Sequence, residues 1–83
     1  MNHHESLGRY VELKEALEAA RIRRHAFLNN LARMAENGSR DRTASFNFAE
    51  ARALLAGAEQ AQTEAEALED PLREAAEGCG KRP

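Results

Sequence analysis

The amino-acid sequence predicts an all-α fold, an antiparallel hairpin of two long helices that pack like a coiled coil. Two mostly apolar stripes predict it, because their spacing alternates between three and four residues, as at the a and d positions of a heptad. The first stripe comprises Tyr10, Leu13, Leu17, Ala20, Arg24, Phe27, Leu31 and Met34. The second, richer in alanine, comprises Ala51, Leu54, Ala58, Ala61, Ala65, Leu68, Leu72 and Ala75. A polar stretch between the stripes allows the chain to fold back on itself.

The two stripes also predict the register of the hairpin. Tyr10 pairs with Ala75 at one end and Met34 with Ala51 at the other, and the position numbers of every pair add to 85. Each a position then faces a d position, as an antiparallel pair requires. Large residues of the first stripe meet small residues of the second, so the helices can approach closely without voids.

Charges beside the stripes agree with this register. It brings Lys14 near Glu69 and Arg23 near Glu64. Exposed ion pairs of this kind contribute only a few tenths of a kcal/mol each. The positions of these charges are independent of the apolar stripes, so their pairing is a check on the register.

Arg24 stands at a stripe position where an apolar residue is expected. We expect its aliphatic stem to pack on Ala61 while the guanidinium reaches water or a carboxylate such as Glu64. Polar residues at a positions can instead set register or oligomeric state, and that alternative stays open, as does contact with an acidic group of a partner.

Punctuating residues divide the single predicted domain, residues 1–83, into its parts. These are helix 1 at about 4–37, a loop at 38–46, helix 2 at about 47–77 and a flexible tail at 78–83. Asn37-Gly38 is typical of a helix C-terminus, because glycine readily adopts the left-handed conformation found there.

Helix 2 has a strong predicted start. Asn47 is a good N-cap, Glu50 three residues later completes a capping box, and Phe46 is placed to pack as a hydrophobic staple. Pro71 lies inside the helix, where it removes a backbone donor. Because the stripe continues in register beyond Pro71, we expect a kink there and not a break.

Composition limits the classes of function. The chain has 83 residues, 31% of them charged and 5% aromatic, with no Trp, as is typical of long solvated helices. A two-helix hairpin offers no cleft that excludes water, so no enzyme activity, cofactor or small-molecule substrate is expected. His3, His4 and Cys79 are potential metal-ligand types near the chain ends, but no second Cys or paired His spacing accompanies them. No metal site is therefore predicted.

The same sequence features predict the cellular setting. Met1–Ser6 contains no apolar segment of a signal peptide, and no aliphatic run is long enough to span a bilayer. A single Cys cannot form an internal disulfide, which favours a reducing compartment. The expected setting is the cytoplasm, without contact to a membrane.

An apolar flank lies beside the seam, which is the line along which the two stripes pack. It suggests association with another protein chain. Near the loop, the e positions place Leu28 opposite Leu55 and Ala35 opposite Phe48, with Phe46 close by. A two-helix hairpin has no second layer to cover these residues, and exposed apolar patches mark interaction sites. We predict a homodimer that forms a four-helix bundle, or docking of the flank on a different protein, and the two are compatible.

These observations predict a small non-catalytic protein-interaction module of the adaptor, inhibitor or co-chaperone type. Its layout is similar to that of the small hairpin co-chaperones of bacterial secretion systems. It is also similar to small phage-encoded proteins that occlude a host protein. These likenesses concern the architecture and carry over no residue.

Nucleic-acid binding is the alternative function. The layout resembles the Rop-type regulators, dimers of helical hairpins that bind RNA through a helix face. Potential phosphate contacts on this chain are Arg21, Arg23, His25, Arg40, Arg42 and Arg52. The candidates for electrostatic contacts of any kind are Arg21, Arg23, Arg24, Arg40 and Arg42. The net charge of −2 and the absence of aromatic residues interleaved with basic ones argue against this alternative.

Overall fold

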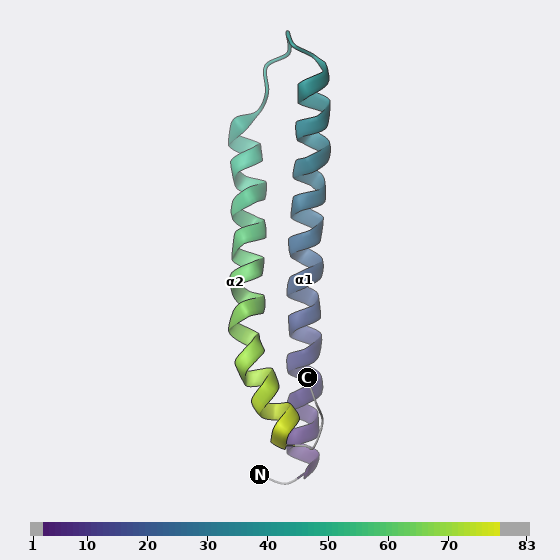
Figure 1. Cartoon of the computed structure of the whole chain (residues 1–83), viewed down its shortest axis with the longest axis vertical. Helices are drawn as coiled ribbons and strands as arrows, with labels where there is room; N and C mark the ends of the chain where they lie inside the picture. Colours follow the sequence, from purple (N-terminus) through teal and green to yellow (C-terminus); the bar gives the residue numbers. More distant parts are fainter. Residues whose placement is uncertain (1–2, 79–83) are drawn as a thin grey trace.

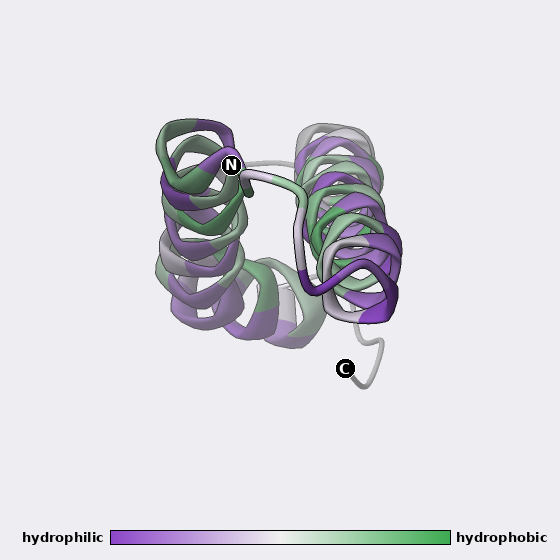
Figure 2. Ribbon diagram, turned by 90° about the horizontal axis from the view of Figure 1, so that it is seen from above, coloured by the Kyte–Doolittle hydropathy of each residue, from purple (hydrophilic) through white to green (hydrophobic). Residues whose placement is uncertain are grey.

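The computed structural model describes residues 3–78 and confirms the all-helical hairpin (Figure 1). Helix α1 spans His3–Arg40, and helix α2 spans Phe48–Gly78. The helices run antiparallel and form an elongated body of 63 × 16 × 14 Å. Figure 2 views this body along its length and shows the two helices side by side, with no other described segment over either broad face.

The core follows the two predicted stripes. Its buried apolar residues are Leu17, Ala20, Ala58, Ala61, Ala65, Leu72, Ala75 and Ala76. Ala20 and Ala65, a predicted pair, belong to one buried cluster, against which Leu13 and Leu68 pack. Arg23 also forms the predicted ion pair with Glu64. These contacts confirm the register, with most of the fully buried positions on the alanine-rich helix.

Gly57 brings the helices together in the loop-proximal half. A Cβ added at Gly57 would lie 2.9 Å from the Phe27 ring, so only glycine leaves room for the ring in this position. The sequence placed Phe27 opposite Ala58 in the heptad register and gave Gly57 no role. The ring therefore packs closely on Gly57, the residue before its predicted partner.

The predicted end of helix 1 at about residue 37 is wrong, because α1 continues to Arg40. Gly38 remains helical and makes room for Phe46, whose ring would lie 2.5 Å from a Cβ at that position. The last turn is stabilised by an ion pair of 2.6 Å between Arg40 and Glu36. Gly38 therefore serves close packing of the loop, where the sequence suggested a helix stop.

The connection at 41–47 is held by local side-chain bonds. Asp41 accepts hydrogen bonds from the Thr43 hydroxyl and from the Thr43 backbone N–H, at 2.7 and 3.0 Å. These bonds favour the ionised form and lower the pKa of the Asp41 carboxyl below its ordinary value. Any stability that this turn derives from the ionised carboxylate is present above the ordinary pKa and is lost as the pH falls through the lowered one.

The start of α2 is capped as predicted. The Glu50 backbone N–H donates to the Asn47 side-chain oxygen at 3.0 Å, and the Asn47 amide approaches the Glu50 carboxylate at 3.5 Å. Helix α2 begins at Phe48, one residue after the cap. Phe46 also lies against Gly38 of α1, so its ring reaches the other helix of the hairpin.

Pro71 lies inside an unbroken α2, and the last turns of the helix incline toward α1 (Figure 1). A proline removes one helical hydrogen bond and bends the helix at that point. Beyond the bend, Ala75 and Ala76 are buried, Ala76 completely. The predicted tail at 78–83 is not tested, because Gly78 ends α2 and the residues after it lie outside the described part.

Candidate interaction surface

One side of the hairpin carries a shallow groove between α1 and α2, formed by four hollows that follow one another along the molecule. We call it the flank groove. Its loop-proximal part is lined by Leu28, Ala35, Phe46, Phe48 and Leu55. Its central part is lined by Arg21, Arg24, Glu59, Gln62, Glu66 and Glu69. The groove therefore runs from an apolar end at the loop into a charged region.

The apolar end brings together the residues that the sequence assigned to the flank. Leu28 and Leu55 line one hollow, and Ala35, Phe46 and Phe48 line the next. Phe48 is 64% exposed and Leu55 54% exposed, which makes them two of the most exposed large apolar side chains of the described residues. Transfer of such side chains from water into an apolar contact is favourable by roughly 1.5–3 kcal/mol each when burial is complete.

An aromatic pair borders this end of the groove. The rings of Phe46 and Phe48 meet edge to face, with centroids 4.8 Å apart and an interplanar angle of 70°. Phe46 is half-buried against Gly38, whereas Phe48 remains exposed. The loop-proximal end of the groove thus carries an exposed aromatic ring in contact with a half-buried one.

Arg24, the polar residue of the first stripe, bonds a polar side chain of α2 other than the carboxylate suggested for it. It is exposed, and its Nε donates to the Gln62 side-chain oxygen at 3.0 Å. Glu64, the acid suggested for it, is paired with Arg23 instead. The guanidinium group of Arg24 thus lies across the central part of the groove.

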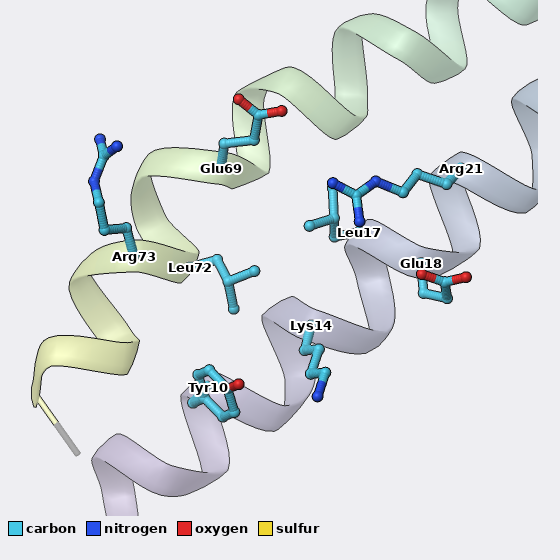
Figure 3. A pocket seen from close by; sticks show the side chains of 8 residues that line it. All are labelled: Tyr10, Lys14, Leu17, Glu18, Arg21, Glu69, Leu72 and Arg73. Atoms are coloured by element: carbon cyan, nitrogen blue, oxygen red, sulfur yellow. The ribbon is translucent and has the colours of Figure 1, made fainter. Parts of the chain in front are cut away.

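The hollow at the opposite end of the groove is lined by both charged and apolar side chains (Figure 3). Leu72 points from α2 toward α1, while the charged ends of Lys14 and Arg73 point outward on opposite sides. The ammonium of Lys14 lies 5.8 Å from the centre of the Tyr10 ring. The expected attraction between Lys14 and Glu69 is therefore not a direct ion pair, although both line this hollow.

The five arginines suggested for electrostatic contacts are not brought into one patch. Arg21 and Arg24 line the groove, and Arg23 is tied to Glu64 outside it. Arg40 pairs with Glu36 at the end of α1, and Arg42 is exposed in the connection. A phosphate backbone requires a continuous basic stripe, which this distribution does not provide.

Catalytic and metal-binding groups were not predicted for this chain. Among the described residues, no group of three or more His, Cys, Asp or Glu side chains converges on a point that could hold a metal ion. The side chains of His3 and His4, and Cys79, lie outside the described part. Neither α1 nor α2 is long and apolar enough to cross a membrane.

Comparison with known proteins gives no relative for this chain. No protein-family model, no curated protein and no solved structure matches it. The function of the chain is therefore inferred from its own residues and from the flank groove.

Proposed function

We propose that this chain is a non-catalytic protein-interaction module of the adaptor, inhibitor or co-chaperone type. Its proposed binding surface is the flank groove. The observation that supports the proposal is the exposure of Phe48 and Leu55 beside the half-buried Leu28, on a face that no other described element covers. Large apolar side chains gathered on one face mark association sites. Self-association into a four-helix bundle belongs to the same proposal.

The shape of the surface suggests how a partner is bound. The groove lies between two antiparallel helices and follows their length, so a helix or a helical pair of the partner fits it best. Apolar contacts near the loop would supply most of the affinity, since buried apolar area dominates association. The charged central region would select the partner's orientation.

Site-specific photo-crosslinking in the native cell tests this function. A benzophenone amino acid replaces Leu55 in one variant and Ile22 in a control, because Ile22 is equally apolar, 60% exposed and outside the groove. Light should link the chain from position 55, and not from position 22, to a different protein, with or without additional adducts to a second copy. Adding Leu28→Asp to the position-55 variant should remove that adduct.

Other outcomes would contradict the proposal. Adducts that form equally from both positions would show that the groove has no special role. Adducts to nucleic acid alone would favour the Rop-like alternative. Adducts to a second copy alone, or none at all, would argue against an adaptor, inhibitor or co-chaperone.

A further inference from the structure

We propose that the flank groove is covered by a second copy of this chain, aligned in parallel so that both loops lie at the same end of a four-helix bundle. The inference rests on the proposed function, because it takes the flank groove as the binding surface. In this arrangement a two-fold axis runs along the hairpins between their facing grooves. Each α1 then lies over the partner's α2, at the same level along the axis.

The gradient of polarity along the groove is the first argument. Apolar side chains line the groove near the loop, at Leu28, Leu55 and Phe48, whereas the central region is charged. A two-fold axis parallel to the hairpin preserves the level of every residue. The parallel alignment therefore places the apolar end of one copy on the apolar end of the other and keeps the charged regions together.

The signs of the charges are the second argument. In the central region, α1 contributes Arg21 and Arg24, whereas α2 contributes Glu59 and Glu66. In the register of the hairpin, Arg24 lies about level with Glu59, and Arg21 about level with Glu66, within roughly one turn of helix. Because α1 faces the partner's α2, each arginine meets an acidic residue of the partner, and the two-fold axis repeats every such contact.

Several of these charges have no partner within one hairpin. In the described part of the chain, the side chains of Arg21, Glu59 and Glu66 form neither an ion pair nor a hydrogen bond. By contrast, Arg23 and Glu64, on the other side of the seam, are already paired with each other. The charges that stay available thus gather on the side where the apolar flank is exposed.

The opposite alignment, with the loops at opposite ends, is disfavoured by the same residues. It places α1 over the partner's α1, and Arg21 lies close to the midpoint of His3–Arg40. Arg21 and Arg24 would then face their own copies, and Glu59 would lie near Glu66 of the partner subunit. The apolar end of each groove would also cover the opposite end of the other, which is lined by both charged and apolar side chains.

The size of the face fits a stable dimer. A body 63 Å long and 16 Å wide presents a broad face of roughly 1,000 Å², and a standard interface buries about 800 Å² on each partner. Both loops, each with its Phe46–Phe48 pair, would lie side by side at one end of the bundle. A partner protein would thus meet two copies of the loop at once.

A distance measurement between spin labels distinguishes the alignments. The purified full chain carries Ala44→Cys in a Cys79→Ser background, which places one label in each loop. Pulsed electron paramagnetic resonance should give a distance below roughly 30 Å, because helix axes in a bundle lie only about 8–10 Å apart. The opposite alignment would give about 60 Å, close to the length of the hairpin.

A second label position controls for dimer formation itself. Thr63→Cys, near the middle of the hairpin and facing outward, should give a similar short distance in either alignment. A short distance from position 63 with a long one from position 44 would overturn the parallel alignment. No dipolar signal from either position, with a monomer by light scattering, would overturn the dimer and leave the proposed function to the crosslinking test.

Charge reversal gives an independent readout of the same contacts. Arg21→Glu with Arg24→Glu should raise the dimer Kd about 10- to 100-fold, and adding Glu59→Arg with Glu66→Arg should restore it. In the opposite alignment the first pair of changes merely exchanges arginine–arginine repulsion for glutamate–glutamate repulsion. An unchanged Kd for that double variant would therefore overturn the proposal.

Discussion

Leu28→Asp together with Leu55→Asp is expected to convert the protein into a monomer and to lower its helicity. Leu55 is 54% exposed in the single hairpin, and Leu28 faces it across the groove. Burial of a leucine is favourable by roughly 1.5–3 kcal/mol, and a two-fold dimer buries each changed position twice. A carboxylate in the same contact adds a desolvation cost. The dimer Kd should therefore rise by at least about a thousandfold, measured by sedimentation velocity with circular dichroism.

A matched variant separates the groove from general effects of charge. Val11→Asp with Ile22→Asp adds the same two charges at apolar positions that are 43% and 60% exposed and lie outside the groove. That variant should remain as dimeric as the wild type. If both variants behave alike, whether dimeric or monomeric, the flank groove is not the self-association surface.

Gly57→Leu is expected to lower the free energy of unfolding by about 1–2 kcal/mol net, because overpacking a filled contact costs about 1–3 kcal/mol. The first atom of the new side chain already meets three atoms of the Phe27 ring at 2.9–3.0 Å. The gain in helix propensity over glycine, about 1 kcal/mol, offsets only part of this cost. Urea denaturation at one fixed protein concentration measures the difference.

Gly8→Leu is the matched control for Gly57→Leu. A Cβ at Gly8 meets nothing within 4 Å, so the same change there should raise stability by a few tenths to about 1 kcal/mol. Adding Phe27→Ala to Gly57→Leu should recover part of the lost stability, because the new side chain can fill the space of the ring. Equal effects at positions 8 and 57, or no recovery, would refute close packing of Phe27 on Gly57.

The elements that the sequence predicted correctly depend on repeated or local signals. The seam repeats over the whole chain, and only Arg24 of its members is fully exposed. The cap at Asn47 needs only Glu50, three residues away, and forms as expected. The pairing of Arg23 with Glu64 follows from the register alone.

The departures from prediction arise from contacts between distant parts of the chain. Gly38 resembles a helix stop locally, but it is retained in α1 because the ring of Phe46 packs on it. Ala76 lies next to the predicted stripe and not in it, yet it is fully buried, because α2 inclines toward α1 after Pro71. Neither effect is visible in the spacing of neighbouring residues.

The candidate site was predictable in part for the same reason. Heptad positions placed Leu28 opposite Leu55 and Ala35 opposite Phe48, and both pairs line the groove. The sequence did not show that Arg21 and Glu66 line the continuation of that groove without forming an ion pair. Which charges remain unpaired depends on side-chain geometry, and this detail distinguishes one dimer alignment from the other.

We expect a second copy of the chain to cover the flank groove in the functional state of the protein. Methyl NMR with a soluble paramagnetic agent tests it most directly on the purified wild type, by comparing Leu55 with Ile22. The two side chains are 54% and 60% exposed in the single hairpin. If a second copy covers the groove, the Leu55 methyl signals will be protected from the agent while that of Ile22 is broadened. Equal broadening of both would contradict the coverage of the groove by a second copy.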